Sequence, residues 1–274
     1  MNVLLTVSSS ALVSALVSAI AAFLTQRHVA NRKAQLDYEL IARRKLYEAI
    51  GPLRLQLVLA SLELMRRVAA HDGKTWEMDP NSYYVRSFVY RILRPLAIIQ
   101  LIEQKMAITD FTVDSSALDL VQFAIAAPKT LSGSELLLRH PHADHSNQSQ
   151  HLYFDTVRAV ASRLIVEQAD APSRVAGYGE FVSAVPDLTA DPDFAPMAAL
   201  FSECSNLTEK PILWLRLVAY GHLCKHFVDK HGTSLGIKAR YFPTESLIKK
   251  AEDDIIPPRA AEHLRRIEQL ATEF

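Results

Sequence analysis

Residues 3–25, VLLTVSSSALVSALVSAIAAFLT, contain no charged side chain, and residues 1–26 as a whole carry none. A helix needs about 20 apolar residues to cross the roughly 30 Å hydrocarbon core of a bilayer. Serine and threonine are tolerated in such a helix because their hydroxyls bond back to a carbonyl of the preceding turn. We therefore expect a transmembrane helix over residues 1–26.

Two other interpretations of this segment stay open. A secretory signal peptide would need basic residues before the apolar run, but only Met1 and Asn2 precede it, and the run is long for a signal peptide. The small residues around Ala21 would still permit cleavage there. A buried helix of a soluble domain is the second alternative.

A basic segment follows the apolar one. Residues 27–70 carry nine Lys or Arg side chains against four Asp or Glu, whereas the whole chain is neutral. This pattern is typical of a juxtamembrane region, and positive charge marks the cytoplasmic side. We expect a single-pass protein of the inner (plasma) membrane with its C-terminal domain in the cytoplasm and the lipid bilayer as one partner.

Small residues repeat every fourth position within the apolar segment. Because hydrophobic force between helices is weak in lipid, small residues that allow close backbone approach favour association. We therefore expect a homo-oligomer, although alanine and serine are also common membrane residues and the repeat can arise by chance. The predicted oligomerisation face has one row at Ser10, Ser14, Ser18 and Ala22, and a second row at Ala11, Ala15 and Ala19.

The remainder of the chain predicts an all-α fold, because helical periodicity recurs between proline-marked boundaries. Residues 236–242 are the one candidate strand. We divide the chain into a transmembrane helix (1–26), a basic juxtamembrane helical stalk (27–71) and an all-α cytosolic domain (72–274). Helices are expected at 29–70 with a break or kink at Gly51-Pro52, at 81–107 after an Asp79-Pro80 start, at 115–127 between Asp114 and Pro128, and near 151–169, 173–184, 192–204, 209–230, 244–254 and 258–272.

Three clusters carry possible site chemistry. Imidazoles beside a carboxylate are suitable ligands for zinc. The first candidate metal site is formed by His140, His142 and His145 with Asp144. The second is formed by His222 and His226, which share a helix face. A surface loop and a polar helix end are the plainer interpretations of these two. Third, an arginine stripe with a tyrosine can hold a phosphate or a nucleotide base, or simply face solvent. Its members are Arg86, Tyr90, Arg91 and Arg94.

Composition and motifs narrow the function further. Neutral net charge gives no signature for nucleic acid, and no nucleotide-loop or nucleophile-elbow motif is present, so an enzyme is disfavoured and no cofactor is expected. Cys204 and Cys224 fit a reducing compartment.

We expect a membrane-anchored, self-associating scaffold or sensor whose cytosolic domain binds a protein partner or small ligand. The alternatives are a membrane-disrupting oligomeric effector of a bacterial defence or stress system, by analogy of architecture, and a metal-dependent enzyme using a histidine cluster.

Overall fold

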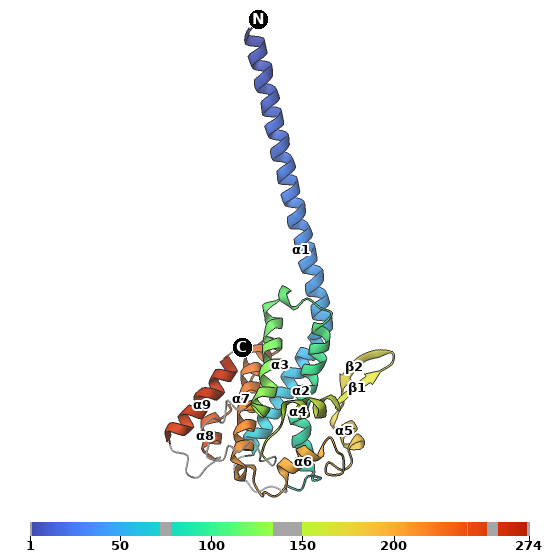
Figure 1. Cartoon of the computed structure of the whole chain (residues 1–274), viewed down its shortest axis with the longest axis vertical. Helices are drawn as coiled ribbons and strands as arrows, with labels where there is room; N and C mark the ends of the chain where they lie inside the picture. The colour runs from blue at the N-terminus through green and yellow to red at the C-terminus, as the bar shows by residue number, and fades with distance from the viewer. Residues whose placement is uncertain (1, 72–77, 134–149, 240, 251–256, 273–274) are drawn as a thin grey trace.

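The computed structural model describes residues 2–71, 78–133, 150–239, 241–250 and 257–272, with side chains from Ser18 onward except at 115, 257, 258 and 260. Helices dominate these residues, which confirms the predicted all-α fold (Figure 1). The helices are α1 (Asn2–Ala70), α2 (Tyr83–Met106), α3 (Ser115–Ser132), α4 (Phe154–Ser162), α5 (Tyr178–Ala184), α6 (Ala195–Phe201), α7 (Pro211–Gly232), α8 (Thr244–Lys249) and α9 (Pro257–Thr272), with 3-10 turns η1 (Phe111–Val113), η3 (Leu207–Glu209) and η4 (Thr233–Leu235) and strands β1 (Ile165–Gln168) and β2 (Ala171–Val175).

Helix α1 has two parts that differ in their surroundings. Its N-terminal part stands clear of the domain as a straight rod (Figure 1), and the side chains of residues 18–41 are almost all exposed. Buried positions begin at Ala42 and recur at Leu46, Ile50, Leu53 and Leu57, one helical face. The stalk predicted over 27–71 is therefore divided: its first half is exposed, and its second half belongs to the core.

The predicted break at Gly51-Pro52 is wrong, because α1 continues through both residues. Proline 52 removes the hydrogen bond that the Glu48 carbonyl would accept within the helix. Both Glu48 and Pro52 lie on the exposed face of α1, so water can serve that carbonyl. Burial of Ile50 and Leu53 on the opposite face holds the helix together across the proline.

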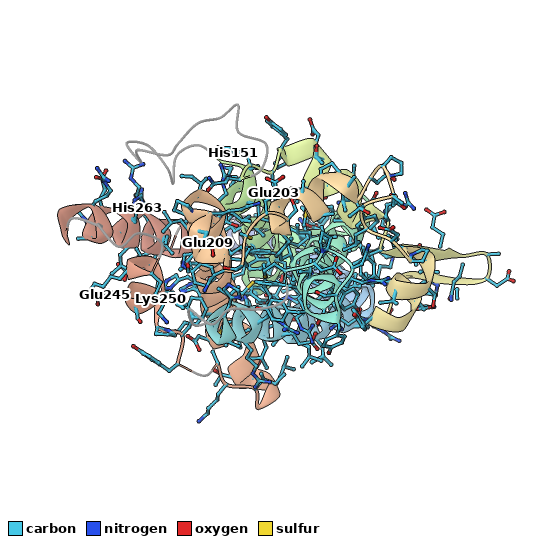
Figure 2. All side chains as sticks on the ribbon, turned by 90° about the horizontal axis from the view of Figure 1, so that it is seen from below. His151, Glu203, Glu209, Glu245, Lys250 and His263 are labelled. Carbon is cyan, nitrogen blue, oxygen red and sulfur yellow. The ribbon has the colours of Figure 1, made fainter. Side chains whose placement is uncertain are left out.

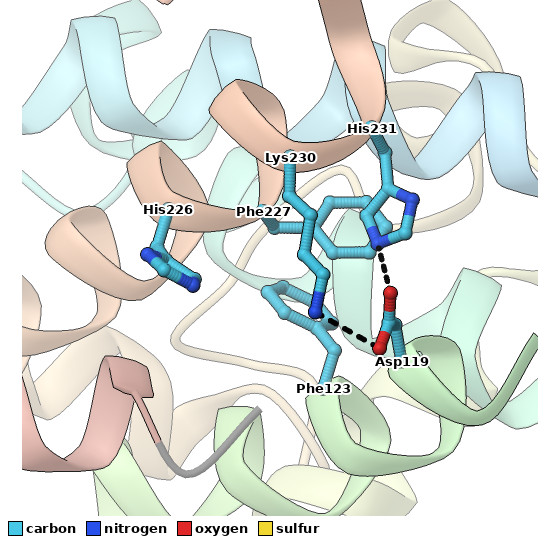
Figure 3. Close-up of a pocket in the computed structure, with 6 residues that line it drawn as sticks. All are labelled: Asp119, Phe123, His226, Phe227, Lys230 and His231. Atoms are coloured by element: carbon cyan, nitrogen blue, oxygen red, sulfur yellow. Dashed lines mark ion pairs between the residues drawn. The ribbon is translucent and has the colours of Figure 1, made fainter. Parts of the chain in front are cut away.

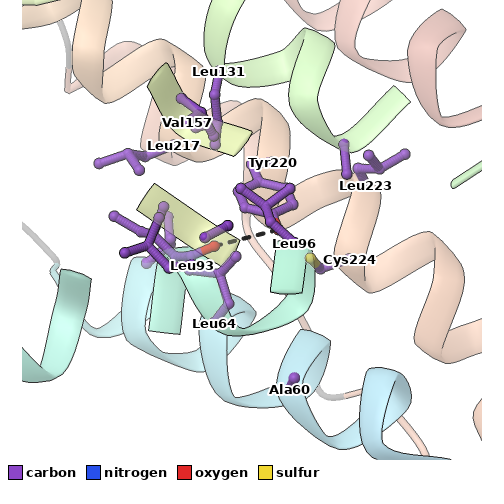
Figure 4. Packing of buried hydrophobic residues seen from close by; sticks show 14 of the residues in the cluster. Ala60, Leu64, Leu93, Leu96, Leu131, Val157, Leu217, Tyr220, Leu223 and Cys224 are labelled. Atoms are coloured by element: carbon purple, nitrogen blue, oxygen red, sulfur yellow. Dashed lines mark hydrogen bonds between the residues drawn. The ribbon is translucent and has the colours of Figure 1, made fainter. Parts of the chain in front are cut away.

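Helix α7 is the central helix of the domain. Its residues 212–221 are all buried, so neighbours cover it on every side, and it packs against α1, α3, α8 and α9. Figure 4 shows Leu217, Tyr220, Leu223 and Cys224 of α7 against side chains of α1 and α2. Charged side chains such as Glu245 lie at the rim, as the view from below shows (Figure 2).

Capping residues explain where several helices begin. Asp114 accepts a hydrogen bond from the Ser116 N–H and starts α3 as predicted, although α3 passes through Pro128 and ends at Ser132. Helix α2 is capped by Ser82 rather than by Asp79. The Asp79 side chain instead accepts the Asn81 N–H, forming a turn before the cap.

The helix predicted over 151–169 is wrong beyond Ser162. The chain there forms the antiparallel hairpin β1–β2, with Ile165 opposite Val175 and Gln168 opposite Ala171. The β-branched pair Ile165-Val166 favours a strand, and Pro172 is incompatible with a helix interior. Residues 236–239, part of the candidate strand, have no regular structure, and Gly236 ends η4 with a left-handed φ of 72°.

The predicted membrane segment is described only in part. Its side chains up to residue 17 lie outside the described residues. Among the helices in the described part, none combines the length and the apolar character that crossing a membrane requires.

Candidate functional site

An open cleft lies along one face of α2, between α1 and α5. It has a volume of about 290 Å³. Helix α2 contributes most of the lining at positions spaced by three, four, seven and eight residues, which share one helix face. The lining residues are Glu63 of α1, Tyr83, Ser87, Tyr90, Arg91 and Arg94 of α2, and Tyr178 of α5; we call this the Arg–Tyr cleft.

Two arginines converge on one serine at this cleft. The buried Ser87 hydroxyl accepts hydrogen bonds from Arg67 Nη2 at 2.8 Å and from Arg91 Nη1, which also donates to the Ser87 carbonyl at 3.0 Å. Neither guanidinium has a carboxylate partner within the described part of the chain. Burial and the nearby charge of Arg91 lower the pKa of Arg67. Two unneutralised cations therefore meet at one oxygen.

The third arginine of the cleft is neutralised. Arg94 Nη1 donates to Glu63 Oε2 at 2.9 Å, and the Arg94 guanidinium also lies over the Tyr90 ring, 6.0 Å from its centroid. Glu180, on the neighbouring α5, is held by both guanidinium nitrogens of Arg174 at 2.6 and 2.8 Å. The cleft therefore keeps a positive balance, carried by Arg67 and Arg91.

Tyrosines form the other wall. Tyr83 and Tyr178 pack edge to face, with ring centroids 5.9 Å apart at 85°, and Tyr90 meets Tyr178 at 5.5 Å. The Tyr90 hydroxyl donates to the Ala176 carbonyl at 2.9 Å, and burial raises the pKa of Tyr90. The phenol of Tyr90 therefore stays uncharged at neutral pH, and the Tyr83 ring is the most open of the three, being 69% exposed.

Arg86, a predicted member of this site, is engaged elsewhere. Its guanidinium donates to the carbonyls of Val182, Val185 and Pro186, at 3.0, 2.5 and 3.2 Å. These carbonyls lie at or just beyond the C-terminal end of α5, where a cation is favourable. The structure thus brings Tyr90, Arg91 and Arg94 together and assigns Arg86 to holding α5 against α2.

The histidine clusters have different outcomes. His140, His142 and His145, with Asp144, lie outside the described residues. The ring of His222 is hydrogen-bonded through Nδ1 to the Thr244 hydroxyl at 2.7 Å, and burial lowers the pKa of His222 to about 4. No group of three histidine, cysteine, aspartate or glutamate side chains in the described ranges is placed to hold a metal ion. The predicted metal site stays a prediction without supporting geometry.

His226 lies beside a second, much smaller cavity (Figure 3). Phe123 and Phe227 line it, Asp119 forms an ion pair with Lys230 at 3.0 Å, and His231 Nε2 lies 3.4 Å from the other carboxylate oxygen of Asp119. The volume of about 10 Å³ holds at most one water molecule. We therefore interpret the residues around this cavity as structural contacts that hold α3 against α7.

The predicted oligomerisation face is only partly described. The side chains of Ser10, Ala11, Ser14 and Ala15 lie outside the described residues, whereas Ser18, Ala19 and Ala22 are exposed on the rod of α1. Exposure is what a contact between copies requires, but it does not test the prediction.

Sequence reasoning missed several residues of the cleft. Ser87 could have been predicted from the sequence, because it precedes Arg91 by one helical turn and shares its helix face. Glu63, Arg67 and Tyr178 lie on other elements, and only the packing of α1 and α5 against α2 brings them to the site.

Comparison with known proteins does not assign the cleft. No protein-family model, no curated protein and no solved structure matches this chain.

Proposed function

We propose that this protein is a membrane-anchored, self-associating helical sensor whose cytoplasmic domain binds a small anionic ligand in the Arg–Tyr cleft. The observation that carries the proposal is the meeting of Arg67 and Arg91 at Ser87, with no carboxylate partner among the residues that the structure describes. Guanidinium groups bind phosphate oxygens strongly and in fixed geometry. An anion seated there would offset the repulsion between the two cations.

The anchor and the self-association rest on the sequence. The uncharged run of residues 3–25, followed by the basic segment 27–70, supports a membrane helix with the domain in the cytoplasm. The rows of small residues support contact between copies. The long exposed rod of α1 is consistent with a domain held away from its anchor.

Ligand binding is tested by calorimetric titration of the full chain in mild detergent with inorganic phosphate. Arg91→Gln is expected to weaken binding by about tenfold or more, because a hydrogen bond to a charged group contributes roughly 1.5–3 kcal/mol. Arg44→Gln is the matched control, since Arg44 is exposed and pairs with Glu48 on α1. Absence of phosphate binding, or equal affinity in wild type and Arg91→Gln, would refute the ligand part of the proposal.

Self-association is tested by the mass of the detergent-solubilised chain in analytical ultracentrifugation. Wild type is expected to be an oligomer, and Ser14→Leu with Ser18→Leu is expected to dissociate it because the larger side chains prevent close approach. Val13→Leu with Val17→Leu, which adds bulk on a neighbouring face, is the control and should leave the oligomer intact. A monomeric wild type would refute this part and leave the anchor.

One observation favours the second candidate, an effector that opens the bilayer. Glu63, which lines the cleft, and Arg67, which donates to its Ser87, both belong to α1, the helix that begins at Asn2. A ligand in the cleft would therefore contact the element proposed to lie in the membrane. The effector predicts dye leakage from vesicles containing the protein upon ligand addition, whereas a scaffold or sensor predicts intact vesicles.

A further inference from the structure

The size of the Arg–Tyr cleft restricts its ligand to a small molecule. Its volume of about 290 Å³ lies at the lower end of the roughly 300–1,000 Å³ usual for ligand pockets. A dinucleotide or a lengthy peptide would extend far beyond it. The cleft thus suits one compact ligand.

Its charges restrict the ligand further. The positive balance lies at Arg91 and Arg67, but Glu63 places a carboxylate on the same lining, with 41% of its side chain exposed. Glu63 Oε2 accepts a hydrogen bond from Arg94. The other carboxylate oxygen, Oε1, can therefore accept a hydrogen bond from a hydroxyl or amino group of a ligand. A ligand with one phosphate and a neutral hydrogen-bond donor matches both ends.

The tyrosines add a planar surface at a distance from the arginines. The Arg91 guanidinium is bonded at Ser87, which lies four residues after Tyr83 on α2, about 6 Å along the helix axis. A ligand that contacts both carries its charge on one side and a ring on the other. The open face of Tyr83, supported edge-on by Tyr178, is suited to stacking a planar ring.

The geometry points to a nucleoside monophosphate as the ligand of the Arg–Tyr cleft, an inference that rests on the proposed function. Its phosphate lies against Arg91 and Arg67, its ribose or base donors face Glu63, and its base stacks on Tyr83. A free phosphate or a glycerol phosphate headgroup shares the anionic chemistry but has no ring for the tyrosine wall.

The inference is tested by calorimetric titration of the full chain in detergent with four probes: adenosine monophosphate, inorganic phosphate, glycerol 3-phosphate and adenosine. Adenosine monophosphate is expected to bind tightest, by about 5- to 150-fold over inorganic phosphate, the range that one stacked base contributes. Equal binding of adenosine monophosphate and either phosphate probe, or of adenosine and its monophosphate, would overturn the inference.

Variants separate this inference from the proposed function. Tyr83→Ala should weaken adenosine monophosphate by the same 5- to 150-fold and leave inorganic phosphate unchanged, whereas Arg91→Gln should weaken both. Tyr83 is largely exposed, so its removal should spare the fold; Tyr241→Ala, at an 86% exposed tyrosine outside the cleft, is the control. Phosphate binding that is insensitive to Tyr83→Ala, with no gain from the nucleoside, would refute the nucleotide and keep the anion site. Absence of binding by all four probes would refute both.

Discussion

Protonation of His71 should destabilise the protein, because this histidine is held uncharged in the core. It follows the last residue of α1 and is fully buried, with its ring 5.4 Å from that of Trp214. The backbone N–H of Leu207 donates to His71 Nε2 at 3.1 Å, Asn206 Oδ1 lies 3.1 Å from the same nitrogen, and Nδ1 is hydrogen-bonded with the Tyr84 hydroxyl at 2.6 Å. Burial lowers the pKa of His71 from 6.5 to about 4.

The sign of the effect follows from the two pKa values of His71. Because the pKa of the folded state is the lower one, the unfolded chain binds the proton more readily. The stabilisation is complete above pH 6.5 and is lost as the pH falls from 6.5 towards 4. A difference of 2.5 pKa units corresponds to at most about 3 kcal/mol, or about 1.4 kcal/mol for each pH unit in that interval.

The assay is urea unfolding of the full chain in constant detergent at pH 7 and pH 4.5, followed by the fluorescence of the buried Trp214. In His71→Gln, whose amide can still accept the Leu207 N–H, the fall in unfolding free energy between the two pH values should be about 2–3 kcal/mol smaller than in wild type. His222 and His231, whose pKa values burial also lowers to about 4, contribute equally to both proteins. Equal falls in wild type and variant would refute the reasoning.

Four further substitutions test the packing. Gly221→Ala would place a methyl group 2.7 Å from Phe242 Cζ and should lower the free energy of unfolding by about 1–3 kcal/mol, measured by thermal melting. Gly51→Ala, on the exposed face of α1, should instead raise the free energy of unfolding by roughly 0.5–1 kcal/mol. Leu57→Ala, at a fully buried position, should cost about 2–5 kcal/mol in urea unfolding. Tyr47→Phe removes a hydrogen bond to the segment before α3 and should speed amide exchange in α1 near residue 47 while lowering global stability by less than about 1 kcal/mol.

Local signals predicted the helices that depend on local chemistry. Asp114 caps α3, and Pro211 and Pro257 stand at the first positions of α7 and α9. The failures lie where tertiary packing or a turn prevails over helical periodicity. Pro52 is carried through α1 by the buried face opposite it, and the chain reverses between Gln168 and Ala171 although the apolar spacing before it is helical.

The candidate site was predictable to the extent that it lies on one helix. Tyr90, Arg91 and Arg94 were found because four-residue spacing on α2 places them together. The same spacing included Arg86, and only the packing of α5 reveals that its guanidinium is occupied by carbonyls. Arg67 precedes Arg91 by 24 positions, so periodicity could not pair them.

The exposed part of α1 is held at its base by three contacts with the segment before α3. The Tyr38 hydroxyl donates to Asp110 at 2.9 Å, Arg43 Nε donates to the Val113 carbonyl at 2.9 Å, and the Tyr47 hydroxyl donates to Asp114. We call these three contacts the collar; α1 would tilt about this point. From residue 38 to residue 2 the helix extends for about 54 Å, so each degree of tilt at the collar displaces the far end by about 1 Å. A tilt of α1 caused by a ligand at Glu63 or Arg67, even one too small to disturb the core, would therefore produce a larger displacement of the N-terminal end of the helix.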